Sequence, residues 1–539
     1  MMFEWWRGCV IYQVYPRSFQ DSNGDGIGDL FGIYERLDYI ARLGVDAIWI
    51  SPFFKSPMKD FGYDISDYKD VDPVFGSLED FKKLLEKAHS LGIKVLIDQV
   101  WSHTSDQHAW FKESRQDIQN NRKDWYVWAE AKADGTPPNN WLSYFGGPAW
   151  TWDARRQQYY LHHFLKEQPT LNLWHPEVRN AIKDIAAFWL DMGVDGFRLD
   201  VAHAYLYDQA LRDNPARKKG EPYPSDLPSS NPMTRQVRLY SMNVPENLQW
   251  IEELRGFINA SWPDRCLLGE AGGDDSEKEA VVYTQTGKRF NLAYSFGLVG
   301  SPMSKNDIVK TVSRVESLLE DGWVCWATNN HDFKRAVSRI PGETANIIKA
   351  RFNAILGLSL RGNYCMFQGE ELGLPQAELS FEDLQDPYDK SLYPEHVGRD
   401  GCRTPIPWQH DIFHAGFSTS IKSWLPVCSA HVTLAVDLQE NDESSTLKFY
   451  QKFLAFRKTS LALRVGYFAL LNTPDPIVSW IRFYDKEQFM FIFNVSTEET
   501  NYVFEEFVFN PIAEFCESVK IEGNTMTLSP YGFAILQKA

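Results

Sequence analysis

The sequence predicts an α/β fold, and three observations lead to that prediction. Short strand-like runs alternate with longer helical patterns from residue 10 to about residue 460, the order expected of a parallel sheet built from βαβ units. Hydrophobic residues make up 44% and charged residues 24%, as in ordinary folded globular chains. With 539 residues, the chain is long enough for one large barrel with attachments or for two to three domains.

Eight segments carry the strand pattern. They are residues 10–15, 46–51, 94–100, 196–201, 267–270, 292–296, 324–328 and 364–368. Eight strands that alternate with helices are the number that closes a parallel sheet on itself. The sequence therefore predicts a (β/α)8 TIM barrel.

Two of the intervening helices have clear expected boundaries. The first begins after an N-cap at Ser77, carries Glu79 and Asp80 in its first turn, and ends at Gly92. The second carries an apolar stripe at helical spacing that stops at Gly193. The members of this stripe are Val178, Ile182, Ile185, Trp189 and Met192. Each helix leads directly into a predicted strand.

Two parts of the chain depart from the alternation. About 70 residues separate the third strand from the helix near His175, far more than a usual βα loop, which predicts an inserted subdomain. After residue 462, apolar and polar residues alternate, which predicts a terminal antiparallel β domain. The alternating runs are residues 477–483, 488–493, 501–508, 524–528 and 532–536. The expected division is a barrel over 1–102 and 175–462, an insert over 103–174 and a C-terminal β-sandwich over 463–539.

Charge and cysteine usage limit the partners and the location. A net charge of −17 repels phosphate backbones and anionic lipid, so a small neutral substrate is expected rather than nucleic acid or a membrane. No secretory signal and no apolar run of membrane-spanning length are visible. Seven scattered cysteines without metal-ligand spacing are typical of reduced thiols, so we expect a cytoplasmic protein. We expect a monomer or weak homodimer, but no sequence pattern specifies the oligomeric state.

Polar side chains stand at the ends of four predicted strands, where the loops of a barrel converge on one mouth. They are Asp98, His103, Arg198, Asp200, Glu270, His331 and Asp332. Charged side chains at the ends of apolar strands are costly unless function or pairing holds them there. Local pairing explains any one of them equally well, but the whole set predicts an active site.

Four sequence blocks carry these residues in a fixed order. The blocks are Asp98-Gln99-Val100-Trp101-Ser102-His103, Gly196-Phe197-Arg198-Leu199-Asp200, Leu268-Gly269-Glu270 and Asn329-Asn330-His331-Asp332. Together they resemble the α-amylase family of retaining glycosidases (glycoside hydrolase family 13), and within it the α-glucosidase and oligo-1,6-glucosidase branch. The resemblance covers the whole chain and includes residues 62–68, 168–172, 368–371 and 398–401.

The resemblance implies three catalytic residues. Asp200 is the expected nucleophile, which forms a covalent glucosyl-enzyme, and Glu270 is the general acid that later acts as base. Asp332 is expected to hold sugar hydroxyls and to stabilise the transition state. Arg198 is expected to keep Asp200 ionised, whereas Glu270 needs a raised pKa to stay protonated.

The resemblance also implies a pocket for one glucose unit. His103 and His331 are expected to donate hydrogen bonds to the sugar, with Tyr63 as a stacking platform. Asp60 and Arg399 are expected to close the pocket behind the non-reducing end. A closed end implies an exo-acting α-glucosidase that releases α-glucose from maltose, malto-oligosaccharides, isomaltose or sucrose.

Three features bear on specificity. Gln168 is assigned to the substrate site, but Thr170 replaces the acidic residue usual in its segment. Val201 is the residue type that this branch associates with α-1,6 bonds, although a β-branched residue suits any barrel strand. Residues 205–247 contain six prolines and either wall off the leaving-group side or form plain surface. The preference between α-1,4 and α-1,6 bonds stays open.

A loop near the N-terminus places oxygen atoms at alternate positions, as hard divalent cations prefer. An EF-hand requires a glutamate at the twelfth position, which is Gly32 here, and a plain Asx/Gly turn is an alternative. The resemblance implies a structural Ca²⁺ or Mg²⁺ and no organic cofactor. Its ligands would be Asp21, Asn23, Asp25, the carbonyl of Ile27, and Asp29.

Two rival functions remain at the sequence level. A glucosyltransferase or isomerase of the same family would pass the covalent intermediate to a sugar instead of water. A non-catalytic, transporter-associated relative would keep the barrel and lose the acids. The presence of Asp200, Glu270 and Asp332 argues against the second rival.

Overall fold

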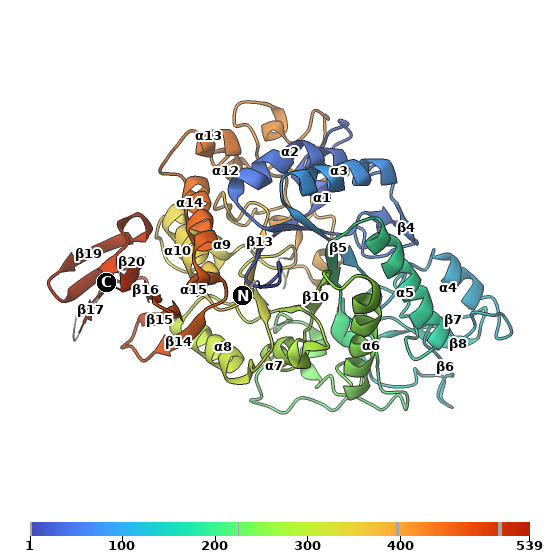
Figure 1. Cartoon of the computed structure of the whole chain (residues 1–539). Coiled ribbons are helices and arrows are strands. Elements are labelled where there is room, and N and C mark those ends of the chain that lie inside the picture. The colour runs from blue at the N-terminus through green and yellow to red at the C-terminus, as the bar shows by residue number, and fades with distance from the viewer. Residues whose placement is uncertain (1–2, 225, 395–397, 505–508, 539) are drawn as a thin grey trace.

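Eight parallel strands close a barrel in the computed structural model, which describes residues 3–224, 226–394, 398–504 and 509–538 (Figure 1). Each strand pairs with the next one along the chain, and the last pairs with the first. The strands are β1 (Val10–Val14), β2 (Ala47–Ile50), β5 (Lys94–Gln99), β9 (Gly196–Leu199), β10 (Cys266–Glu270), β11 (Leu292–Tyr294), β12 (Val324–Trp326) and β13 (Asn363–Phe367). The predicted barrel is confirmed.

Alternate side chains of the barrel strands serve two separate cores. Ile11, Leu96 and Leu268 pack with one another in one buried cluster, whereas Val10 and Val95 belong to the larger cluster shared with the helices. This division follows from the two-residue period of a strand, whose successive side chains point to opposite faces. The strands are therefore apolar on both faces, and polar function is left to their ends.

The two helices with predicted boundaries are present. In α3 (Leu78–Ser90), Ser77 and Asp80 form a reciprocal capping box, and Gly92 follows in the left-handed region at φ 75°. The predicted stripe lies on α5 (Pro176–Asp191), which Gly193 follows at φ 106°. Both predictions are confirmed.

The other helices lie outside the barrel or beside the C-terminal sheet (Figure 1). They are α1 (Pro16–Phe19), α2 (Leu30–Leu43), α4 (Ala109–Ser114), α6 (Pro245–Ser261), α7 (Ser276–Val282), α8 (Lys305–Leu318), α9 (Ala336–Arg339), α10 (Asn346–Ser359), α11 (Pro387–Leu392), α12 (Ser429–Val432), α13 (Val436–Glu440), α14 (Thr446–Thr459) and α15 (Leu461–Arg464). Among the described residues, none of the helices has the length and apolar character needed to cross a bilayer.

The segment between β5 and α5 contains a small antiparallel sheet. Its strands are β6 (Trp128–Ala129), β7 (Trp150–Asp153) and β8 (Gln158–Leu161), in the order β6-β8-β7. Trp141, Trp150 and Leu161 form its core together with Tyr207, which comes from the long connection after β9. A separate pair, β3 (Phe54–Lys55) and β4 (Asp67–Val71), follows β2. The insert therefore packs against the β9–α6 connection at the barrel mouth.

A seven-stranded antiparallel sheet forms the C-terminal part of the chain. Its strands are β14 (Tyr467–Leu471), β15 (Ile477–Tyr484), β16 (Glu487–Asn494), β17 (Thr500–Val503), β18 (Phe509–Pro511), β19 (Glu517–Glu522) and β20 (Thr525–Lys538). The predicted runs 524–528 and 532–536 are one strand, β20, divided by a left-handed residue at Tyr531. Of the predicted run 501–508, residues 505–508 lie outside the described residues.

Candidate active site

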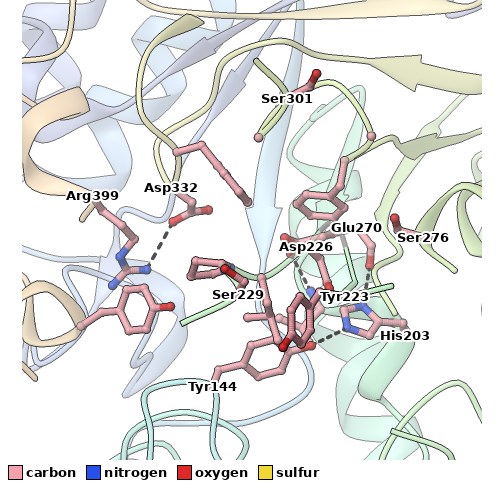
Figure 2. A pocket seen from close by; sticks show the side chains of 18 of the residues that line it. Tyr144, His203, Tyr223, Asp226, Ser229, Glu270, Ser276, Ser301, Asp332 and Arg399 are labelled. Carbon is pink, nitrogen blue, oxygen red and sulfur yellow. Dashed lines mark hydrogen bonds and ion pairs between the residues drawn. The ribbon is translucent and has the colours of Figure 1, made fainter. Parts of the chain in front are cut away.

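A cavity of about 930 Å³ opens at the carboxyl ends of the barrel strands (Figure 2). The structure brings nine of the ten predicted catalytic and substrate-binding residues to its wall. They are Asp60, Tyr63, His103, Gln168, Asp200, Glu270, His331, Asp332 and Arg399. The tenth, Arg198, contacts Asp200 and Glu270 directly. Residues from seven separate parts of the chain thus share one cavity.

A buried guanidinium group connects the carboxylates at the base of this cavity. Arg198 Nη1 lies 2.5 Å from Asp200 Oδ1 and 3.1 Å from Asp98 Oδ1, and its Nη2 lies 2.6 Å from Glu270 Oε2. Arg198 is on β9, Asp98 is the second-last residue of the neighbouring strand β5, and Glu270 is the last residue of β10. One cation therefore balances three acids that the barrel brings together.

The backbone turns sharply immediately after Asp200. Val201 adopts the left-handed region at φ 45° and ψ 40°, which is a genuine outlier for a β-branched residue. In this conformation the Val201 N–H donates to Glu270 Oε2 over 2.9 Å. The strained turn thus fixes the orientation of the predicted acid relative to the predicted nucleophile.

Burial shifts the pKa of both predicted catalytic carboxyl groups upward. It raises the pKa of Glu270 to about 8 and that of Asp200 to about 7, while Arg198 opposes the shift in each. Arg198 therefore acts on Asp200 in the predicted direction, but burial outweighs it. Because the Glu270 pKa is the higher one, Glu270 holds a proton at pH values where Asp200 is ionised. This order suits an acid beside a nucleophile.

Charged groups close the opposite end of the cavity. Arg399 Nη2 lies 3.0 Å from Asp60 Oδ1, and Arg399 Nη1 lies 3.3 Å from Asp332 Oδ1. Burial alone would raise the pKa of Asp332, but His331, Arg399 and Arg403 together lower it well below its usual range. Burial raises the pKa of Asp60 to about 6 against the effect of Arg399. Asp332 is therefore the firmly ionised carboxylate of the site.

Neutral side chains line the floor between the two ends. The Tyr63 hydroxyl lies 2.8 Å from His331 Nε2, and the two rings stack with centroids 5.5 Å apart. Gln168 Nε2 donates to Asp60 Oδ2 over 3.0 Å and lies 3.2 Å from His103 Nε2. Burial lowers the pKa of His103 to about 4 and that of His331 to about 3, so both rings are uncharged near neutral pH. An uncharged imidazole has one donor and one acceptor, and in each ring both nitrogens lie within hydrogen-bond distance of protein atoms.

Comparison with known proteins identifies the family. A family model described as the catalytic domain of alpha amylase matches residues 13–466. The chain belongs to the α-amylase family.

Members of the α-amylase family that are similar to this chain include two glucosidases and a solved transfer enzyme. A protein of Rhizobium meliloti (strain 1021) named "Probable alpha-glucosidase" is 49% identical over 92% of this chain and 90% of its own length. An oligo-1,6-glucosidase of Parageobacillus thermoglucosidasius is 37% identical over 91% and 90%. The crystal structure of the alpha-glucosyl transfer enzyme XgtA is 49% identical, covers both chains fully and superimposes with a TM-score of 0.96. The chain is thus a glycosidase of the α-amylase family.

Sequence reasoning missed the strongest partner of Arg399. Asp386 is completely buried, and it accepts from both Arg399 Nε and Arg399 Nη2, the latter over 2.6 Å. The same carboxylate accepts from the Tyr388 N–H over 3.1 Å and caps α11. An Asp before Pro387 predicts only such a cap, so no sequence pattern indicates its second role. Asp386 orients the arginine that closes the cavity.

The leaving-group side was also incompletely predicted. The described residues within 205–244, hereafter the wall loop, line the cavity beside Glu270 with Tyr223, Asp226 and Leu227. His203, three residues after the predicted nucleophile, lies 3.0 Å through Nε2 from the Tyr144 hydroxyl. Figure 2 shows Tyr144, His203, Tyr223 and Asp226 near Glu270, across the cavity from Arg399 and Asp332. The structure therefore favours a wall over plain surface for this segment.

The predicted cation loop is well ordered by its own hydrogen bonds. Asp21 accepts from the N–H groups of Asn23, Gly24 and Gly26 over 2.7–3.0 Å and from the Ser418 hydroxyl over 2.5 Å. Asp29 caps α2 through the Gly32 N–H, and Asp25 accepts from the Ile27 N–H. The oxygen donors suit a hard cation in kind, but a cation would compete with these bonds. The cation stays a prediction.

Elsewhere, one group of three side chains comes within metal-binding distance among the described residues. These are His410, Asp411 and Asp437, of which the first two are exposed. The His410 ring is already paired with Asp437 at 2.8 Å. This group lies outside the cation loop predicted from the sequence.

Proposed function

We propose that this protein is a retaining exo-acting α-glucosidase that removes α-glucose from the non-reducing end of short α-glucosides. The observation that carries the proposal is the closed end of the cavity. Arg399 ties Asp60 and Asp332 together there, while Asp200 and Glu270 lie beyond it beside the open, leaving-group side. A cavity closed behind the glucose unit accepts a chain end and excludes a chain interior.

The proposed reaction has two steps. Asp200 attacks the anomeric carbon as the bond to the leaving oxygen breaks, and Glu270 gives its proton to that oxygen. This leaves a glucosyl ester on Asp200 and an ionised Glu270. Glu270 then takes a proton from water, the resulting hydroxide attacks the same carbon, and the bond to Asp200 breaks. Two displacements retain the α configuration.

Transfer to a sugar is the second candidate function. A hydroxyl group of an acceptor sugar can replace water in the second step, with Glu270 again accepting the proton. The similarity to a structure titled as an α-glucosyl transfer enzyme supports this outcome. The wall loop also supports it, since Tyr223 and Leu227 provide an apolar surface beside Glu270 where an acceptor would lie.

The linkage preference is proposed to include α-1,6 bonds. Val201 is the residue type that the resemblance associates with this linkage, and it lines the cavity beside Asp200. A relative named oligo-1,6-glucosidase supports the same preference. An oligo-1,6-glucosidase is therefore the nearest alternative to a general α-glucosidase.

Glucose release from maltose, isomaltose and sucrose, measured side by side, tests the function. Release from any of them that is lost in Asp200→Asn would establish the glucosidase and its preferred linkage. A folded wild-type protein that cleaves none of the three would refute simple α-glucoside hydrolysis. Adding a second sugar as acceptor and following new oligosaccharides separates transfer from hydrolysis.

Further properties are also proposed. A small neutral substrate, and no nucleic acid, suits the net charge of −17. The seven cysteines are free, which supports a cytoplasmic location. A structural Ca²⁺ or Mg²⁺ in the 21–29 loop, a monomer or weak homodimer, and the domain limits 103–174 and 463–539 remain proposals. Sedimentation tests the oligomeric state, and limited proteolysis tests the domain limits.

A further inference from the structure

The wall loop contains a buried ion pair close to the catalytic acid. Arg238 Nη1 donates to Asp226 Oδ2 and Arg238 Nη2 to Asp226 Oδ1, each over 2.8 Å. Arg238 is only 3% exposed. Two parallel bonds between a guanidinium and a carboxylate form the strongest and most directional type of ion pair. Because the loop has almost no regular secondary structure, such a pair is a main constraint on its shape.

The same pair joins the wall loop to the turn that follows Glu270. Asp226 Oδ2 accepts from the Gly273 N–H over 3.1 Å, and the Arg238 N–H donates to Asp274 Oδ2 over 2.7 Å. A Cβ atom placed on Gly272 would lie 2.6 Å from Asp226 Oδ2, so the contact requires glycine there. The loop and the turn are therefore joined by hydrogen bonds, each between a side-chain carboxylate of one and a backbone N–H of the other.

Hydrogen bonds extend from the pair to the cavity wall. Arg238 Nη1 donates to the Tyr144 hydroxyl over 3.2 Å, and that hydroxyl lies 3.0 Å from His203 Nε2. His203 Nδ1 lies 3.1 Å from the Gly272 backbone nitrogen and 3.2 Å from the Glu270 carbonyl oxygen. Figure 2 shows Asp226, His203 and Tyr144 on the Glu270 side of the cavity. The pair is thus connected to the insert, to β9 and to β10.

We propose that the Asp226–Arg238 pair is a latch that holds the wall loop over the leaving-group half of the cavity and so limits the length of the leaving group. The inference rests on the proposed glucosidase function and assigns a specificity role to two residues that do not touch the reacting atoms. Among the described residues, Asp226→Asn leaves the buried Arg238 only its longer ion pair with Asp274, from Nε to Oδ1 over 3.6 Å, and this loosens the loop at its contact with the turn. The glucose end, held by Arg399, is unaffected.

The ratio of two specificity constants tests the latch. In Asp226→Asn, kcat/KM for maltotetraose divided by kcat/KM for maltose is expected to rise about fivefold, the order found for coupling between contacting groups. This ratio does not depend on the fraction of active enzyme, so partial misfolding does not move it. Arg238→Lys, which keeps the charge and loses the second bond, is expected to give a smaller rise. An unchanged or lower ratio in both variants overturns the latch.

Asp208→Asn is the matched control. It removes an ion pair with Arg212 from the same loop, but that pair is at the surface, with the Arg212 side chain 59% exposed. The ratio is expected to stay at the wild-type value. A rise equal to that of Asp226→Asn would mean that any loosening of the loop has this effect, and would overturn the specific role of the buried pair.

Tryptic cleavage tests the latch without activity. Lys218 and Lys219 are exposed in the wall loop. Cleavage at these lysines is expected to be several times faster in Asp226→Asn than in wild type or in Asp208→Asn, because a released loop reaches the protease more often. Equal rates overturn the latch. If wild type cleaves neither sugar, the proposed function fails, and this measurement still decides whether the pair holds the loop.

Discussion

The two ends of the cavity are built differently. At the glucose end, Arg399 is surrounded by Asp60, Asp332 and Asp386, and the loops that carry these residues are tied by several buried ion pairs. At the leaving-group end, an irregular loop is held by Asp226–Arg238, by an ion pair between Arg217 and Asp274, and by hydrogen bonds to backbone. The glucose end is suited to one sugar in one orientation. At the leaving-group end, the position of the wall loop can change without disturbing the catalytic acids.

Glu270, the proposed catalytic acid, lies at the leaving-group end of the cavity. Replacing it should distinguish the two ends most clearly. In Glu270→Gln, kcat for maltose is expected to fall about 10³-fold, because no group protonates the leaving oxygen. Hydrolysis of α-glucosyl fluoride, whose leaving group needs no proton, is expected to fall less than about tenfold in the first step. Equal losses on both substrates would show that Glu270 does not act as the acid.

Asp386→Asn tests the glucose end. In the part of the chain that the structure describes, loss of the carboxylate charge leaves Arg399 held only by Asp60 and Asp332, so the guanidinium shifts. A misplaced binding group of this kind costs about 10²-fold in kcat/KM. The loss is expected to be the same for maltose and for α-glucosyl fluoride, because both place the same glucose in the pocket. Exposed Glu382→Gln serves as the control. A loss that depends on the leaving group would contradict the separation of the two ends.

The pH profile of kcat/KM reports the ionisation of Asp200 and Glu270, which lie between the two ends of the cavity. Asp200, with a pKa of about 7, must be ionised, so kcat/KM is expected to fall tenfold per pH unit below that value. Glu270, with a pKa of about 8, must be protonated, so activity falls again above it. With α-glucosyl fluoride, whose leaving group needs no proton, the alkaline limb of kcat/KM should be absent and the acid limb should remain. A profile centred near pH 5 would contradict the raised values.

Val201 lies where the two ends meet. Replacing it with Ala or Thr is expected to lower the ratio of kcat/KM for isomaltose to that for maltose about threefold, since a small pocket change discriminates weakly. Val201→Ile keeps the branched side chain and should preserve the ratio. If Ile changes the ratio as much as Ala does, the size of the side chain rather than its branching at Cβ decides the linkage.

The cation loop should influence neither end. If the 21–29 loop binds Ca²⁺ or Mg²⁺, chelation is expected to lower the melting temperature by about 2 °C or more and to leave both substrate ratios unchanged. Calorimetry with and without EDTA measures the shift. Asp25→Ala should remove the response. An equal response in that variant would place the cation elsewhere.

The sequence predicted the glucose end better than the leaving-group end. Asp60 and Arg399 were paired from the resemblance although 339 residues separate them, and the structure places them 3.0 Å apart. Asp386 and Asp226 could not be predicted, because each lies in an irregular segment whose shape no residue period specifies. The wall loop itself was recognised only as a long proline-rich stretch with two open interpretations.

What the sequence determined by itself is the barrel and the placement of its acids. Apolar strands of fixed period must pack on helices, so polar residues such as Asp200 and Glu270 are left at strand ends, and strand ends of a closed barrel meet. Only the tertiary structure decided which charges pair there, and that Val201 turns into the left-handed region toward Glu270. Ion pairing depends on distances between segments remote in sequence, and those distances exist only after the chain has folded.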